Sequence, residues 1–392
     1  MSTPTKKILI NFKISSYLPF ISYGKISVLR ILILLTLTDR VFFNNTKGVD
    51  FMKKILMIGT GGTIASKHSE NGLTPGLSPS DILSYIPAVE KVCQVETLQI
   101  CSIDSTNVTP EHWKLMVKTI EDNYNKYDGF VICHGTDTLA YTGAALSYMI
   151  QNSDKPIVIT GSQKPIDLDV TDARTNLLDS FIYASYDKAQ DVTIVFDGKV
   201  IAGTRAKKDR AKSYNAFSSI NFPYIAVIQD GMIVQYIEKQ PFDKPVTFHY
   251  EMEESVVILK IIPGMKPDIL NYIFENYDCI IIESFGVGGI PATMFETLYG
   301  LLEKWNNKGK FVIMTTQVAN EGSNMAVYEV GKKIKQDFNM IEAHDMTLEA
   351  TLTKLMWLMS MPHTDEEKLR TMFYKTINHD ILFTTRAHSE LK

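Results

Sequence analysis

From residue 54 onward, short apolar runs of strand length alternate with longer amphipathic stretches. This alternation is typical of strand–helix–strand units, in which helices cover a sheet of parallel strands. Helices are predicted at 110–124, where Pro110 suits a first turn, at 138–150 and at 348–360. Strands are predicted at 54–58, 129–133, 156–160, 192–196, 256–262, 279–283 and 311–315. The chain is therefore expected to be an α/β protein.

At 392 residues the chain is long enough for two ordinary domains. The segment around 241–254 is polar, contains proline and is acidic at its end, so we place a linker there. We predict a larger N-terminal domain at 52–240, with a mostly parallel sheet flanked by helices. A smaller, Rossmann-like α/β domain is predicted at 255–392.

The first 51 residues differ in composition from the remainder. They carry seven basic and two acidic residues, a net charge of +5, although the whole chain has a net charge of −4. The apolar run at 28–37 is shorter than the roughly 20 residues of a spanning helix, and no small-residue cleavage site follows it. We interpret 1–51 as an extension outside the native core, with Met52 as the preferred start; a tail or weak anchor is the alternative.

Bulk composition excludes several classes of function. A net charge of −4 and a pI near 6.1 argue against a general nucleic-acid or membrane-surface binder. The four cysteines (Cys93, Cys101, Cys133 and Cys279) form no CxxC pair and no cluster with metal-ligand spacing. We therefore expect a reduced, cytoplasmic protein with no metal, no cofactor and no membrane partner.

Two glycine-flanked threonine motifs each follow a predicted strand. Residues 60–64 read Thr-Gly-Gly-Thr-Ile, and residues 134–138 read His-Gly-Thr-Asp-Thr. In α/β proteins, chemistry concentrates beyond the carboxyl ends of parallel strands. Threonine hydroxyls in such turns can act as nucleophiles among backbone N–H groups that stabilise an oxyanion. The structural alternative is that Thr63 simply caps a helix after a glycine turn.

Five further motifs follow the same order as those of a known family. They lie at 103–107 (Ile-Asp-Ser-Thr-Asn), 160–165 (Thr-Gly-Ser-Gln-Lys-Pro), 171–173 (Thr-Asp-Ala), 203–208 (Gly-Thr-Arg-Ala-Lys-Lys) and 345–350 (Asp-Met-Thr-Leu-Glu-Ala). From about residue 52 to about residue 360 the chain thus resembles the L-asparaginase family, in its cytoplasmic (type I) branch. The resemblance implies hydrolysis of L-asparagine to L-aspartate and ammonia, in a homodimer or homotetramer.

The resemblance also implies catalytic roles for individual residues. Thr63 would be the nucleophile, and Lys208 would ease deprotonation of Thr136 or of a water between them. Asp137 would hold the substrate's α-ammonium group. Lys208 is chosen over Lys207 by its register after residues 203–205, although the charged residues around it also suit a solvated surface stretch.

Substrate contacts are implied for two further segments. Ser105 would bind the α-carboxylate of the substrate, with Asp104 beside it for the ammonium group; both are also common turn residues. The backbone N–H groups of Thr63 and Ser162 would stabilise the oxyanion.

The chain departs from the family at two places. The loop position that often carries a tyrosine holds Leu73, so the group that activates Thr63 is unassigned; His68 and Glu70 are nearby candidates that also suit solvated lid residues. Positions matching an allosteric arginine and cysteine of some members are Glu283 and Val318. We therefore expect that effector site to be absent or altered.

Three other functions compete with this hypothesis. A dinucleotide-binding fingerprint would require glycine where Ile64 stands, so an oxidoreductase is disfavoured. An asparaginase-like, ammonia-releasing subunit of a tRNA-dependent amidotransferase is the nearest alternative, although residues 1–51 do not resemble the β-rich module usual in that role. An amino-acid sensor would retain Ser105 and Asp137 without needing Lys208.

Overall fold

The computed structural model describes residues 52–69, 72–305, 308–327, 329–338, 340–362 and 365–382. The predicted extension at 1–51 lies outside these residues. The described residues, from 52 to 382, form one compact unit. Within the described residues, no helix is both long and apolar enough to cross a membrane.

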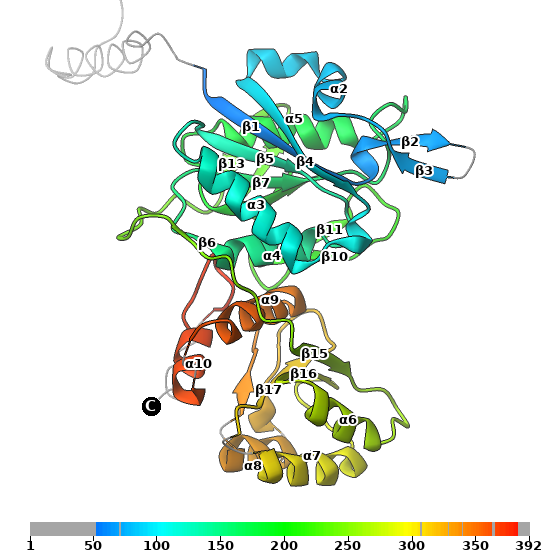
Figure 1. Cartoon of the computed structure of the whole chain (residues 1–392), viewed down its shortest axis with the longest axis vertical. Helices are drawn as coiled ribbons and strands as arrows, with labels where there is room; N and C mark the ends of the chain where they lie inside the picture. Colours follow the sequence, from blue (N-terminus) through cyan, green and yellow to red (C-terminus); the bar gives the residue numbers. More distant parts are fainter. Residues whose placement is uncertain are drawn as a thin grey trace, which may run out of the picture. The chain divides into compact units, whose positions relative to one another are not determined.

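An eight-stranded sheet forms the first half of this unit (Figure 1). Its strand order is β13-β12-β9-β8-β7-β5-β1-β4. The pairs from β8 to β4 are parallel, whereas β9, β12 and β13 continue the sheet in antiparallel fashion. The strands are β1 (Lys54–Gly61), β4 (Gln94–Ile103), β5 (Gly129–Cys133), β7 (Ile157–Thr160), β8 (Val192–Phe196), β9 (Lys199–Ala202), β12 (Ala226–Gln229) and β13 (Met232–Gln235).

Helices cover both faces of this sheet because its central strands are apolar on both faces. In β1, Leu56 and Ile58 pack in the core beneath α3 (Pro110–Asn123) and α4 (Leu139–Met149). Ile55 and Met57 point into a second core, which α2 (Pro79–Ser84) and α5 (Ala173–Ala184) complete. Parallel strands that are buried on both faces appear in the sequence as nearly continuous apolar runs. This is why these strands could be predicted from the sequence.

A smaller, fully parallel sheet forms the second half, in the order β15-β16-β17-β18. One face packs against α6, α7 and α8, and the other joins the core that contains α9 and α10. Helix α9 contacts α4, so the two halves share one apolar core. The elements are β15 (Val256–Lys260), α6 (Asp268–Asn276), β16 (Cys279–Ser284), α7 (Ala292–Trp305), β17 (Phe311–Thr316), α8 (Glu329–Phe338), β18 (Ile341–Glu342), α9 (Leu348–Met359) and α10 (Glu366–Phe373).

Three short antiparallel pairs complete the fold: β2 (Ser66–Ser69) with β3 (Gly72–Pro75), β10 (Ala206–Lys208) with β11 (Phe217–Ser219), and β6 (Ile150–Gln151) with β14 (Thr247–Phe248). The last pair ties part of the predicted linker at 241–254 back to the end of α4.

The predicted fold class is confirmed: a larger, mostly parallel sheet with helices precedes a smaller parallel α/β domain. All seven predicted strands and all three predicted helices form, with ends that shift by at most three residues. The sequence analysis did not name several other elements, among them the edge strand β4, the antiparallel strands β9, β12 and β13, and the helices α5, α6, α7 and α8. Strand β4 alternates half-buried and exposed residues, so it lacks the continuous apolar run of its neighbours.

Candidate active site

A pair of left-handed glycines ends β1 and brings the two threonine motifs into contact. Gly61 and Gly62 have φ values of +105° and +79°, a region that favours glycine. A Cβ on Gly62 would lie 2.5 Å from the backbone of Gly135, in the second motif. Glycine at 62 therefore allows the turns after β1 and β5 to meet.

Thr63 begins a 3-10 turn directly after this glycine pair. The turn spans Thr63–Ala65, and its N-cap is Gly62, without a side-chain capping bond. The capping interpretation of Thr63 is therefore unsupported here. Its side chain is half-buried, whereas Ile64 and Ala65 pack into the core behind it.

Lys208 joins the second threonine motif through two hydrogen bonds. Its Nζ lies 2.8 Å from Thr136 Oγ1 and 2.6 Å from Asp137 Oδ1. The lysine side chain is 18% exposed and that of Asp137 is 55% exposed, so the ion pair lies at the edge of the protein interior. A cation beside a hydroxyl favours its deprotonated form, because it stabilises the alkoxide.

Gln163 completes the contacts of Thr136, a role that the sequence analysis did not assign. The Thr136 hydroxyl donates to Gln163 Oε1 at 3.3 Å, while it accepts from Lys208. The Gln163 amide in turn donates to the backbone oxygens of Arg210 and Ser213. Gln163 lies inside one of the family motifs, but only the folded chain shows its contact with Thr136.

Ser105 lies against the same turn. It is 3% exposed, its Oγ accepts from the backbone N–H of Asp137 at 3.2 Å, and its carbonyl accepts from the Thr138 hydroxyl. Asp104 is exposed, and its Oδ1 accepts from the backbone N–H of Thr106, which is the turn role given above as its alternative. The structure thus brings Ser105 and Asp137 into direct contact.

The loop after β7 carries both Ser162 and Gln163, which are consecutive in the chain. Ser162 is fully buried, and its hydroxyl donates to the carbonyl of Lys164 at 2.5 Å. The Asp172 carboxylate holds this loop by accepting from the backbone N–H groups of Gln163 and Lys164. Burial raises the pKa of Asp172, although these hydrogen bonds oppose the shift.

His134 precedes this motif but is a poor candidate for an acid or base. It is fully buried, and its Nδ1 carries the proton because its partner there, the Gly135 carbonyl, can only accept. Nε2 of the neutral ring therefore accepts from the Thr142 hydroxyl, which itself accepts from Trp113. Burial lowers the pKa of His134 to about 4, so the imidazole is a neutral structural group.

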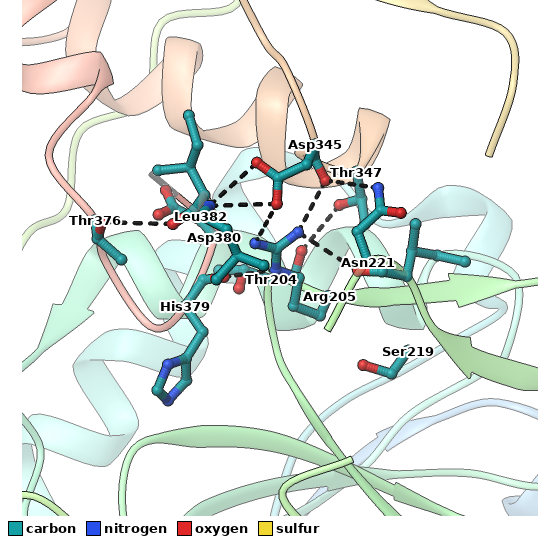
Figure 2. A network of polar contacts seen from close by, with 12 residues as sticks. Thr204, Arg205, Ser219, Asn221, Asp345, Thr347, Thr376, His379, Asp380 and Leu382 are labelled. Atoms are coloured by element: carbon teal, nitrogen blue, oxygen red, sulfur yellow. Dashed lines mark hydrogen bonds and ion pairs between the residues drawn. The ribbon is translucent and has the colours of Figure 1, made fainter. Parts of the chain in front are cut away.

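Two motifs that lie 140 residues apart meet just before Lys208 (Figure 2). The fully buried Arg205 guanidinium donates to the carboxylate of Asp345 at 2.9 Å and to its carbonyl at 2.8 Å. Thr347, the N-cap of α9, donates to the Thr204 carbonyl. The C-terminal motif therefore holds the backbone from which the Lys208 side chain extends.

The side chains of 68–75, which include His68, Glu70 and Leu73, lie outside the described residues. The hypothesis about the activation of Thr63 therefore stays open. Glu283 and Val318 line one cavity together with Lys207, and the altered effector site stays a prediction. Among the described residues, no group of three or more His, Cys, Asp or Glu side chains is placed to hold a metal ion.

Known proteins resemble the chain along both halves. The N-terminal asparaginase domain matches residues 54–241, and the C-terminal domain of glutaminases and asparaginases matches residues 255–373. An L-asparaginase of Thermococcus kodakarensis is 38% identical over 331 residues, which cover 84% of this chain and 99% of that protein. The solved thermostable L-asparaginase of the same organism has a TM-score of 0.77 and 36% identity, with 84% of this chain and all of that one covered.

A second group of relatives consists of glutamyl-tRNA(Gln) amidotransferase subunits D. A glutamyl-tRNA(Gln) amidotransferase subunit of Methanosphaera stadtmanae is 34% identical over 325 residues. This match covers 79% of the present chain but 72% of that protein.

Proposed function

Because the chain belongs to the asparaginase family, with both family domains in order, we propose that it is an L-asparaginase acting through a threonine nucleophile. Membership of this family supports an amidohydrolase. The contact that carries the proposal is the approach of Lys208 Nζ to both Thr136 and Asp137, because it places a cation beside a hydroxyl and a carboxylate.

In the proposed reaction, Thr63 Oγ attacks the side-chain amide carbon of asparagine. The backbone N–H groups of Thr63 and Ser162 stabilise the oxyanion of the tetrahedral intermediate. Protonation of the amide nitrogen releases ammonia and leaves an ester on Thr63. A water then attacks this ester, and its collapse returns the Thr63 hydroxyl and releases aspartate.

Proton transfer in this scheme is assigned to Thr136 and Lys208. Lys208 lowers the cost of removing a proton from Thr136 or from a water next to it. Asp137 and Ser105 bind the α-ammonium and α-carboxylate of the substrate, with Asp104 as a further candidate for the ammonium. We expect asparagine to be preferred over glutamine by about 10–200-fold, the usual discrimination for one methylene in a rigid pocket.

The ammonia-releasing amidotransferase subunit is the second candidate, since such subunits are among the relatives. Coverage favours the independent enzyme: the match spans 99% of the L-asparaginase but 72% of the amidotransferase subunit. In the proposed role the enzyme is a cytoplasmic homodimer or homotetramer. The four unpaired cysteines suit a reducing compartment.

The test is turnover by the purified protein alone. With asparagine as the sole substrate, we expect equal amounts of aspartate and ammonia, without tRNA or a second protein. A protein that binds asparagine without turning it over would be a sensor. A protein that releases ammonia only with a partner subunit present would be the amidotransferase component. Light scattering on the same sample tests the oligomer, and an active monomer would contradict it.

A further inference from the structure

A second polar cavity lies at the amino end of β8. It has a volume of about 30 Å³, enough for a species the size of water, for which about 10–15 Å³ suffices. Its lining includes Gln190, Asp191, Thr193, Gln235, Asn378 and His379, from the segment that enters β8, the end of β13 and the C-terminal segment. Tyr183 and the charged residues Lys188, Glu238 and Lys239 line it as well. We call this space the β8 cavity.

Three buried side-chain oxygens on residues that line the β8 cavity lack a hydrogen-bond partner among the described residues. Thr193 is 3% exposed, yet its Oγ1 makes no hydrogen bond with any residue that the structure describes. The same holds for Gln190 Oε1 and for Gln235 Oε1, although the Tyr183 hydroxyl interacts with the Gln235 side chain. Gln235 Nε2 donates to the Ile237 carbonyl at 2.6 Å, which fixes the orientation of this amide. A buried oxygen without a hydrogen-bond partner costs free energy of folding. Three such oxygens on residues around one cavity therefore indicate a ligand that these oxygens can bind.

The charges around the β8 cavity favour a cation. Asp191 is the acidic residue of the lining that lies next to the unpartnered oxygens, and its backbone is left-handed, with φ of +61°. Burial raises the pKa of Asp191 to about 7, and burial lowers the pKa of His379, so the imidazole is neutral at pH 7. The Nζ of Lys239 donates to backbone oxygens of Asp154 and Ala189, whereas Lys188 and Glu238 are exposed.

We propose that the β8 cavity binds a monovalent cation of potassium or ammonium size. Its ligands are the hydroxyl of Thr193, the amide oxygens of Gln190 and Gln235, and the carboxylate of Asp191. Oxygen ligands suit hard cations, and a single carboxylate among neutral oxygens matches one positive charge. An ammonium ion would donate hydrogen bonds to the same four groups. This site is separate from the residues proposed to hydrolyse asparagine, and the proposal does not depend on that reaction.

The test is thermal unfolding of the full chain at pH 8, above the raised pKa of the Asp191 carboxyl. Potassium, ammonium, sodium and choline chloride are compared at one constant ionic strength. We expect potassium or ammonium to raise the unfolding midpoint by about 5 °C above choline at 100 times the dissociation constant. The concentration at half effect identifies which of the two ions binds more tightly. Equal midpoints in all four salts would show that the cavity holds only water and would overturn the proposal.

Matched variants link the effect to the cavity. Thr193→Val removes one ligand oxygen and should raise the concentration at half effect at least tenfold. Thr119→Val is the control, because the Thr119 hydroxyl is also buried but is satisfied by the Leu115 carbonyl on α3. A Thr193→Val response equal to that of the control would refute the assignment. If Thr193→Val does not fold, Gln235→Glu replaces it; the added carboxylate should lower the concentration at half effect, and an unchanged response would equally refute the site.

Discussion

Lys207 and Lys208 are neighbours in β10, but they point to opposite sides of the strand. Lys208 Nζ lies 2.8 Å from Thr136 Oγ1, whereas Lys207 lines the cavity that also contains Glu283. Alternation along a strand imposes this separation, since successive side chains face opposite ways. The two lysines therefore provide a matched pair of variants.

Lys208→Met keeps most of the side-chain volume and removes the charge beside Thr136. We expect kcat for asparagine to fall by about 100- to 10,000-fold, the usual contribution of a group that assists proton transfer. Lys207→Met should retain most of the activity. Ammonia release at saturating asparagine measures both, with circular dichroism to confirm folding. Similar losses in the two variants would mean that the lysine has been misassigned.

Thr63 and Thr136 should each be indispensable for turnover, and the effects of removing them should not be additive. Thr63→Ala removes the proposed nucleophile, and Thr136→Val removes the hydroxyl that contacts Lys208. We expect each folded variant to lose nearly all turnover, because groups that act as a unit fail together. The double variant should be scarcely slower than either single one. Near wild-type kcat in folded Thr63→Ala would exclude that residue as the nucleophile.

Gly62→Ala should destabilise the protein and inactivate it. The alanine Cβ would meet the Gly135 backbone at 2.5 Å, from a left-handed conformation. A loss of about 3 kcal/mol or more in the free energy of unfolding is expected from the strain and the displaced backbone. Gly300→Ala is the control: in α7 a Cβ there meets nothing within 4 Å, so stability should rise by up to about 1 kcal/mol. Denaturant unfolding compares the two, and equal stabilities would contradict the close approach.

His134 should make the fold sensitive to acid. Its pKa falls from 6.5 to about 4 on folding, so the unfolded chain takes up the proton first as the pH falls. The contribution of the neutral His134 imidazole to the free energy of unfolding is fully present above pH 6.5 and is lost as the pH falls toward 4. Its magnitude is about 3 kcal/mol. His134→Gln should flatten the fall in unfolding free energy between pH 6.5 and 4, relative to wild type. Parallel curves for the two proteins would show that His134 is not the responsible group.

A chain that begins at Met52 should fold and retain full activity. The first core strand starts at Lys54, and the matched asparaginase domain starts at the same residue. Ammonia release and the unfolding midpoint of this chain should equal those of the full sequence. Loss of either would show that residues 1–51 contribute to the enzyme.

Much of the fold could be predicted because burial on both faces leaves a local signature. Strands β1, β5, β8 and β16 are fully or almost fully buried and mostly apolar, and each was found from the sequence. The edge strand β4 was missed because its half-exposed alternation lacks that signature. Helix α5 was missed because its inner face includes the polar residues Asn176, Asp179 and Ser180, which weaken the helical pattern.

The sequence by itself determined the apolar strands, the glycine turns that follow them and the presence of threonines in those turns, because these depend on residues close along the chain. Only the tertiary structure decided which side chains meet. The contacts of Thr136 with Lys208 and Gln163, and of Arg205 with Asp345, join residues 27 to 140 positions apart. Such contacts follow from strand order and register, which apolar periodicity leaves open. The same holds for the β8 cavity, where three distant segments bring their oxygens together.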